Sequence, residues 1–314
     1  MNVLITGAGL VGANAAAVLA ARGDTVTLVD VAPDEAYVRS VVGAPAVRIE
    51  RCDVTDLRAL ATRAQGAEVV MHTAGLIGSR AQRDPHAAVG VNVGGTANAA
   101  EAAHRAGAGR LVYASTHGVY DLDAAGGGAT VNETAPTAAR SVYAATKLSA
   151  EHVLEAASGA YPLDVVVLRF CHLFGRGHYA AGSSGGEAFD ALVRRSVAGE
   201  TGRITTPLAG RSEWLYGKDA GGALARAAVC AAPARFTIVN VGSGRLTGPD
   251  DVVAAIRAVV PGARTGAASA PRQERGRPFD LGTAARVLGW APAYTLESAV
   301  ADYVAEVRAG GLTP

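Results

Sequence analysis

The feature that most constrains the fold is a glycine-rich turn near the N-terminus, because the segments around it predict two strands joined by a helix. Residues 3–6 are a short apolar run, residues 13–21 are rich in helix-forming alanine, and residues 25–30 are a second apolar run. Two parallel strands need a crossover connection, which a helix supplies. The first thirty residues therefore predict a βαβ unit, with the glycines where the first strand turns into the helix.

The turn has the spacing GxGxxG, from Gly7 through Gly9 to Gly12. In this pattern the first glycine permits a tight turn, the second lets a pyrophosphate approach the backbone, and the third lets helix and strand pack closely. The first helical turn, which includes Leu10 and Val11, offers unpaired N–H groups and a partial positive charge to phosphates. These five residues are candidate contacts of a dinucleotide.

An acidic residue supports this interpretation. Asp30 ends the second strand, 18 residues after Gly12, where a carboxylate accepts hydrogen bonds from the adenosine ribose hydroxyls. Because that carboxylate would repel a 2′-phosphate, the pattern favours NAD over NADP. A lone GxGxxG in a chain rich in glycine and alanine is also compatible with an ordinary turn, so the surrounding strands and the acid carry the prediction.

Strands and helices continue to alternate up to about residue 172. Strands are expected at residues 47–49, 68–72, 110–114 and 163–170, and helices at residues 57–65, 85–106 and 138–157. Such alternation predicts a parallel sheet with helices on both faces. The expected fold class is therefore α/β, with a Rossmann-like, doubly wound parallel sheet.

After residue 172 the pattern loosens, and a small C-terminal substrate-binding region is expected at the carboxyl edge of the sheet. Helices are expected at residues 187–198, 220–231, 249–260 and 296–308, short strands at 203–206 and 237–241, and a loop at 175–186. The expected domains are residues 1–172, which bind NAD and carry the catalytic residues, and residues 173–314, some segments of which return to the sheet.

Tyr143 and Lys147 form a second motif, YxxxK. Residues four apart share a helix face, so a phenol and an ammonium can meet one ligand there. An unperturbed tyrosine titrates near 10, and a nearby ammonium and an oxidised nicotinamide both favour the phenolate. Tyr143 is therefore a candidate general base. Without the glycine motif, a surface lysine beside a half-buried tyrosine would explain the pair equally well.

Two hydroxyls directly follow the strand expected at residues 110–114. A hydroxyl on Ser115 or Thr116 can hydrogen-bond the substrate oxygen that Tyr143 deprotonates. Ordinary capping at the end of a strand is the alternative explanation.

Composition narrows the range of partners. With 29 basic and 28 acidic side chains the net charge is +1, which argues against nucleic acid and anionic membranes, both usually met by a basic face. No apolar run is long enough to predict a membrane span, and the first residues lack the basic start of a signal peptide. The three cysteines show no metal-ligand spacing. A reduced, cytoplasmic, metal-free protein is expected.

Further short motifs follow in a set order: residues 52–56 (CDVTD), 72–75 (HTAG), 92–96 (NVGGT), 112–116 (VYAST), 168–170 (LRF) and 288–292 (LGWAP). Together with the two motifs above, this set resembles the extended branch of the short-chain dehydrogenase/reductase superfamily, also described as the NAD-dependent epimerase/dehydratase family. The resemblance runs through nearly the whole chain and implies a homodimer. It also implies a structural role for Asn92.

The resemblance assigns roles to individual residues. Thr116 matches the catalytic hydroxyl, Tyr143 the catalytic acid/base, and Lys147 the lysine that holds the nicotinamide ribose. Asp53 and Val54 match contacts of the adenine. The remaining expected cofactor contacts are Thr73, Ala74, Gly75, Phe170 and His172.

Departures from the family pattern bear on the substrate. The extended branch usually has GxxGxxG, so a tighter phosphate turn is expected here. His117 and Gly118 stand where the family's dehydratases have Asp and Glu, so the acid and base for eliminating water are missing. His172 stands where nucleotide-sugar members usually have an asparagine that contacts the substrate diphosphate.

Expected substrate contacts are Ser115, His117 and Arg211, the last at a position where family members often have an arginine that binds a phosphate or carboxylate. Four more residues are either further substrate contacts or ordinary surface and loop residues: Arg176, Arg203, Arg277 and His178.

The expected function is reversible hydride transfer between NAD and a secondary alcohol or ketone of a polar, sugar-like substrate, such as a sugar or sugar acid. One alternative is an epimerase that holds its NAD tightly and reduces the ketone on the opposite face. A third hypothesis is a non-catalytic NAD(H) sensor.

Overall fold

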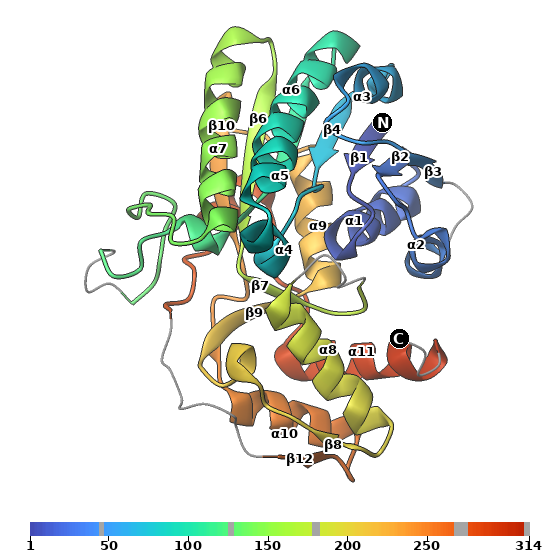
Figure 1. Cartoon of the computed structure of the whole chain (residues 1–314), viewed down its shortest axis with the longest axis vertical. Coiled ribbons are helices and arrows are strands. Elements are labelled where there is room, and N and C mark those ends of the chain that lie inside the picture. Colours follow the sequence, from blue (N-terminus) through green and yellow to red (C-terminus); the bar gives the residue numbers. More distant parts are fainter. Residues whose placement is uncertain (44–46, 125–128, 178–182, 267–275, 311–314) are drawn as a thin grey trace.

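The computed structural model describes residues 1–43, 47–124, 129–177, 183–266 and 276–310 (Figure 1). Its largest sheet has seven parallel strands in the order β10-β6-β5-β4-β1-β2-β3. The strands are β1 (Asn2–Thr6), β2 (Thr25–Asp30), β3 (Val47–Arg51), β4 (Val69–His72), β5 (Arg110–Thr116), β6 (Asp164–Phe170) and β10 (Phe236–Val241). From β1 the strand order continues to one side with β2 and β3 and then to the other side with β4, β5 and β6. The switch point therefore lies between β1 and β4, and doubly wound sheets bind their ligands at such a point. The expected Rossmann-like fold class is confirmed.

Alternation along the strands divides the core between the two faces of the sheet. Val3 and Ile5 of β1 pack into one cluster of buried residues, whereas Leu4 packs into another. The first face is covered by α1 (Leu10–Ala21) and α9 (Gly217–Ala227), and the second by α3 (Leu57–Ala64), α6 (Gly95–Ala106) and α7 (Val142–Ala160). Because helices cover both faces, the strands are apolar throughout rather than alternating.

A smaller region lies below the carboxyl edge of this sheet (Figure 1). It contains the three-stranded sheet β11 (Leu246–Thr247), β9 (Ser212–Tyr216) and β7 (His172–Phe174), the strand pair β8 (Thr201–Gly202) and β12 (Arg264–Thr265), and the helices α8 (Ser184–Val197), α10 (Pro249–Val259) and α11 (Leu296–Ala309). Its core is aromatic, with Phe174, Phe189 and Trp214 buried together. Segments beyond residue 172 also belong to the larger part, since β10 pairs with β6, α9 packs on α1, and a π-helical turn (Ala284–Leu288) packs against β10 and α9.

Several local structures differ from the expectations. The helix expected at residues 85–106 is divided into α5 (Pro85–Val89), a π-helical turn (Gly90–Gly94) and α6. The helix expected from residue 138 begins at Val142, because the Ser141 hydroxyl accepts a hydrogen bond from the Ala144 N–H and caps it. The strand expected at 203–206 is wrong: β8 ends at Gly202, and a 3₁₀ turn (Thr206–Leu208) follows.

Two short helices, α2 (Glu35–Val42) and α4 (Gly78–Arg83), were not expected from the sequence. Within the described ranges, every helix is too short or too polar to cross a membrane.

Candidate functional site

The glycine turn lies between β1 and α1, beside the end of β4. Gly7 has φ +92°, which favours glycine, and a Cβ there would lie 2.7 Å from both the Ala74 nitrogen and Thr73 Oγ1. A Cβ on Gly12 would lie 1.9 Å from the Gly7 carbonyl oxygen, so this position also requires glycine. Gly9 differs from both, because nothing lies within 4 Å of a Cβ placed there. The backbone at Gly9 is therefore open to a ligand.

The N-terminus of α1 carries no side-chain cap, so its first N–H groups and the positive end of its dipole face the same open space. Asp30, at the end of β2, already holds the turn, because Oδ2 accepts from the Ala8 N–H (2.8 Å) and Oδ1 from the Ala32 N–H (3.0 Å). A carboxylate has lone pairs for further donors. Asp30 thus has a structural role that the sequence did not reveal.

The loop after β4 joins this turn to the second motif. The Thr73 hydroxyl donates to the Thr6 carbonyl (2.8 Å), and a Cβ on Gly75 would lie 3.6 Å from Lys147 Nζ. The Asn92 side chain accepts from the Leu76 N–H and donates to its carbonyl, which supports the structural role expected of Asn92. It also donates to Thr146 Oγ1 (2.8 Å), between Tyr143 and Lys147 on α7.

The three expected catalytic residues lie together. Tyr143 and Lys147 are one turn apart on α7, and Thr116 ends the neighbouring strand β5. Lys147 is 3% exposed, and its Nζ donates to the Ala114 carbonyl (2.8 Å) and lies 4.6 Å from the centre of the Tyr113 ring. The Thr116 hydroxyl lies close enough to the Tyr143 phenol to lower the pKa of Tyr143.

The charge states of this pair depend on burial. Burial raises the pKa of Tyr143 to about 12, more than the Thr116 hydrogen bond lowers it. Burial also lowers the pKa of Lys147 to about 8, while Glu151 acts in the opposite direction. In the protein by itself burial therefore dominates the pKa of Tyr143, and the expected lowering by Lys147 together with an oxidised nicotinamide stays a prediction for the complex. The Lys147 ammonium is directed at the Ala114 carbonyl, and its Nζ lies 6.0 Å from the centre of the Tyr143 ring.

Sequence reasoning missed a buried ion pair next to these residues. Glu151 and Arg169 are 3% and 4% exposed at their side chains, with 2.6 Å between Oε2 and Nη2. The Ser115 hydroxyl donates to Glu151 Oε1. Because this hydrogen bond uses the Ser115 proton inside the protein, and Ser115 is buried, the geometry argues against the expected substrate contact at Ser115. The spacing of Glu151, four residues after Lys147, was the available signal.

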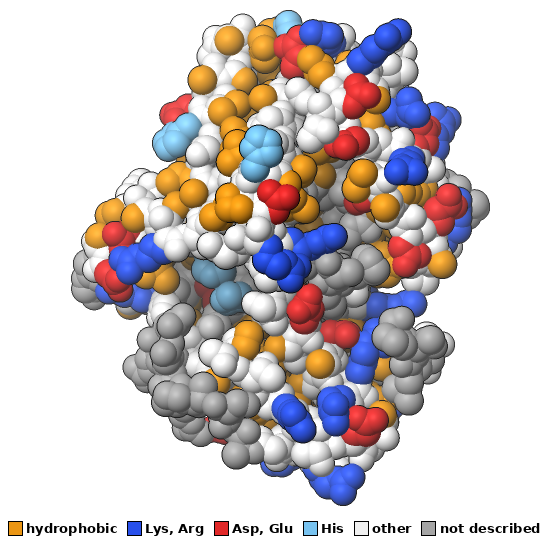
Figure 2. All heavy atoms as spheres, viewed as in Figure 1, with side chains coloured by type: hydrophobic (Ala, Val, Ile, Leu, Met, Phe, Trp, Pro, Cys, Tyr) orange, Lys and Arg blue, Asp and Glu red, His pale blue; other side chains and the backbone are white. Residues whose placement is uncertain are grey.

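Two half-buried histidines lie beside Thr116. The His117 ring is 4.4 Å from the His172 ring, which is 5.0 Å from Trp214, and His117 Nδ1 lies 3.3 Å from the Phe170 carbonyl oxygen. Burial lowers both pKa values, that of His172 to about 3, so both rings are neutral. Figure 2 shows histidine side chains in the hollow between the larger part and the smaller region.

The other expected contacts lie apart from the Tyr143–Lys147 pair. Asp53 is exposed and accepts from the Thr55 hydroxyl, whereas Val54 is buried against Gly95. Arg211 is exposed, just before β9, and donates to the Leu246 carbonyl. Arg203 is exposed and Arg277 is half-buried. His178 lies outside the described residues.

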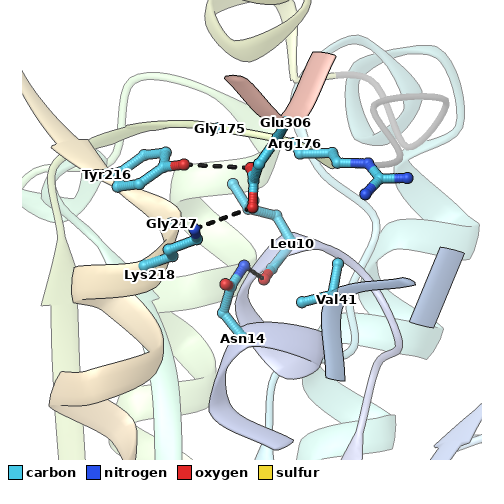
Figure 3. Close-up of a pocket in the computed structure, with 9 residues that line it drawn as sticks. All are labelled: Leu10, Asn14, Val41, Gly175, Arg176, Tyr216, Gly217, Lys218 and Glu306. Carbon is cyan, nitrogen blue, oxygen red and sulfur yellow. Dashed lines mark hydrogen bonds and ion pairs between the residues drawn. The ribbon is translucent and has the colours of Figure 1, made fainter. Parts of the chain in front are cut away.

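A cavity of about 10 Å³ lies where the smaller region meets α1 (Figure 3). The Tyr216 hydroxyl donates to Glu306 (3.2 Å), and Lys218 Nζ lies 3.0 Å from the same carboxylate. Arg176 is at its edge, and its carbonyl accepts from the Tyr37 hydroxyl (3.0 Å). The cavity is only about large enough for one water, and the bonds of this cluster join α11 to β9 and α9.

Comparisons with known proteins agree with this arrangement. A family model described as "NAD dependent epimerase/dehydratase family" matches residues 3–242. The chain is 30% identical to a UDP-glucose 4-epimerase of Mycolicibacterium smegmatis over 97% of both chains. It is 34% identical to a 3 beta-hydroxysteroid dehydrogenase/Delta 5-->4-isomerase of Mycobacterium tuberculosis over 56% of this chain and 48% of that protein, so the match spans about half of that relative's length.

Solved structures resemble the chain over almost its full length. A UDP-glucose 4-epimerase of Thermotoga maritima, solved with UDP-glucose, has a TM-score of 0.85 at 22% identity and 99% coverage of each chain, a likeness that concerns the fold alone. MoeE5, solved with UDP-glucose and NAD, has a TM-score of 0.81 at 26% identity, again with 99% coverage of each chain.

Proposed function

Because the chain belongs to the NAD dependent epimerase/dehydratase family, we propose that it is an NAD-dependent oxidoreductase. It transfers a hydride between NAD and a secondary alcohol or ketone of a sugar-like small molecule. One observation carries the proposal: the glycine turn and the Thr116–Tyr143–Lys147 set meet through Gly75, whose Cβ position is 3.6 Å from Lys147 Nζ. A dinucleotide that starts at the turn can therefore end at the tyrosine.

The residues present fit NAD. Gly9 is open where Gly7 and Gly12 are closely packed, so the turn leaves room at the position where a pyrophosphate approaches the backbone. The uncapped N-terminus of α1 would hold the pyrophosphate, the Asp30 carboxylate the adenosine ribose, and Lys147 the nicotinamide ribose. We propose residues 1–172 as the NAD-binding part and 173–314 as the substrate-binding part, with β10 and α9 returning to the larger one.

Bound NAD supplies the hydride acceptor, and the chain supplies orientation and proton transfer. The Thr116 hydroxyl binds the oxygen of the reacting carbinol and orients it towards Tyr143. With its pKa near 12, Tyr143 is protonated at neutral pH and donates its proton to the oxygen when a ketone is reduced. In the oxidative direction it must accept that proton, which requires positive charge near the phenol to lower its pKa.

Epimerisation is a second candidate, favoured by the UDP-glucose 4-epimerase that matches 97% of the chain. Such an enzyme uses the same oxidation but returns the hydride to the other face, so NAD stays bound. Purified protein that carries NAD and interconverts sugars without accumulating NADH would favour epimerisation. Accumulation of NADH in solution would favour a dehydrogenase. If no alcohol or ketone is turned over, and NAD(H) alters the binding of this chain to another protein, the result would support an NAD(H) sensor.

We further propose a cytoplasmic homodimer that pairs through α6 and α7, which lie side by side on one face of the sheet (Figure 1). The described cysteines are all free thiols, in keeping with a reducing compartment. Light scattering that gives the mass of a single chain would contradict the dimer.

The test is Tyr143→Phe, assayed against free sugars, sugar acids and nucleotide sugars. Turnover should fall at least about a thousandfold, as expected when a proton-transferring group is lost, while NADH still binds with wild-type affinity. Tyr161→Phe, at a half-buried tyrosine that follows the C-terminus of α7 and donates to Glu101, is the control and should remain fully active. Near-wild-type turnover by Tyr143→Phe would refute its assignment as the acid/base.

A further inference from the structure

A third functional group continues the Tyr143–Lys147 face of α7. Glu151 lies four residues after Lys147, as Lys147 lies four after Tyr143, so the phenol, ammonium and carboxylate share one helix face. Glu151 is 2% exposed. A carboxylate so deeply buried beside a proposed catalytic lysine needs an explanation, because a buried charge is costly unless it is paired.

The carboxylate is paired with an arginine and a hydroxyl from two neighbouring strands. Arg169 of β6 donates to Glu151 through Nη2 (2.6 Å) and Nε (3.1 and 3.2 Å), and Ser115 of β5 donates through its hydroxyl. Ser115 and Arg169 are opposite each other in the register of β5 and β6. Glu151 therefore connects α7 to the ends of two strands, at the point where β5 presents Ala114 to Lys147 and Thr116 to Tyr143.

Stability alone does not account for this pair. Replacing a buried ion pair by apolar residues of similar volume is often neutral or stabilising. We propose that Glu151, held by Arg169 and Ser115, is a positioning residue that keeps the Lys147 ammonium charged and directed at the Ala114 carbonyl. This inference rests on the proposed function, in which Lys147 holds the nicotinamide ribose.

The groups around Lys147 make Glu151 its negative partner. His72 of β4 is fully buried and neutral, with its pKa lowered to about 3. Tyr113 of β5 lies under the ammonium, and burial raises its pKa, so its phenol is also neutral. Tyr143 is neutral as well, and Arg169 lies beyond Glu151. Of the charged groups described here around Lys147, Glu151 is therefore the one that favours the ammonium.

The chain offers a direct measurement, because Lys147 and Lys218 are its only lysines. In a Lys218→Arg background, ¹³C-lysine labelling gives one side-chain signal, and its pH titration reports Lys147. The midpoint should lie near 8 and should fall by about one pH unit in Glu151→Gln, the size expected for the loss of one nearby opposite charge. Glu155→Gln, at an exposed carboxylate one turn further along α7, is the matched control and should leave the midpoint unchanged.

A second variant keeps the inference testable if Glu151→Gln does not fold. Glu151→Leu combined with Arg169→Met removes both charges and leaves no unpaired arginine, and it should also lower the Lys147 midpoint. An unchanged midpoint in either folded variant would overturn the inference.

The closing experiment measures NADH binding against pH by nicotinamide fluorescence. If the midpoint falls from about 8 to about 7, binding by Glu151→Gln at about pH 8 should weaken about fivefold relative to wild type, because a smaller fraction of Lys147 is charged. Wild-type affinity across the range would overturn the inference. Failure of the unmodified protein to bind NADH at any pH would instead contradict the proposed function.

Discussion

Replacing Gly12 by alanine tests whether the glycine turn serves packing or ligand binding, especially when compared with Gly9→Ala. Gly9 caps α1 and Gly12 lies in its first turn, and neither has a positive φ. Neither change therefore strains the backbone conformation. Their surroundings differ completely. A Cβ on Gly12 would lie 1.9 Å from the Gly7 oxygen and 3.0 Å from Thr73 Oγ1, whereas a Cβ on Gly9 would meet nothing within 4 Å.

The size of the effect follows from the overlap. A separation of 1.9 Å is about 1.5 Å shorter than the 3.4 Å at which ordinary contact begins, and the neighbour is a backbone carbonyl that cannot rotate away. Overpacking of this kind costs about 1–3 kcal/mol or more, so Gly12→Ala should lower the melting temperature by several degrees. Gly9→Ala should cost less than about 1 kcal/mol, the usual range for replacing glycine at an N-cap.

Both variants should bind NADH more weakly than the wild type, but for different reasons. Gly9→Ala folds normally but places a methyl group where the pyrophosphate approaches, so NADH affinity should fall at least about tenfold with little loss of stability. Gly12→Ala should lose affinity only together with stability, because it displaces Gly7. The measurements are thermal unfolding and NADH fluorescence titration on both variants. A folded Gly9→Ala protein with wild-type NADH affinity would refute the placement of the pyrophosphate at this turn.

Two further predictions concern folding. Gly221→Ala should destabilise the protein by about 1–3 kcal/mol, because its Cβ would lie 2.5 Å from the Asn14 backbone. In Gly222→Ala the nearest neighbour of the new Cβ is Trp290 Nε1 at 3.7 Å, so this variant should be neutral or gain up to about 1 kcal/mol from helix propensity. Equal chemical-denaturation midpoints for the two variants would contradict this packing. His72 has its pKa lowered from 6.5 to about 3 by complete burial, so the unfolded chain binds the extra proton and stability falls as pH drops below about 6.5. Between about pH 7 and 5.5 the free energy of unfolding should drop by about 1 kcal/mol through this group. The buried His117 and His172 add slopes of the same sign, so His72→Leu should reduce the total drop by about 1 kcal/mol, whereas His152→Gln, at an exposed histidine, should leave it unchanged. An undiminished drop in His72→Leu would contradict this assignment.

Local chemistry made much of this protein readable from its sequence. The GxGxxG spacing, the apolar strand runs and the YxxxK spacing depend on residues close together in the chain, so the βαβ unit, the parallel sheet and the shared face of Tyr143 and Lys147 were predictable. Breaks in a helix that are caused by contacts with distant residues were not predictable from the sequence. The π-helical turn at Gly90–Gly94, for example, occurs where the Asn92 side chain turns inward and hydrogen-bonds Leu76 and Thr146. The false strand at 203–206 reflects a short β-branched run, Ile204 to Thr206, with which no strand of the described residues pairs.

What the tertiary structure decided is how distant residues share one environment. Glu151, Arg169 and Ser115 come from three elements, and only the register of β5 with β6 and the packing of α7 bring their charges together. The charge states of Tyr143 and Lys147 likewise depend on burial, which raises the pKa of Tyr143 and lowers that of Lys147 in the protein by itself. Residue types and spacing determined which groups could act. Desolvation and long-range pairing, which do not exist until the sheet and helices assemble, decided which of them are charged and where they point.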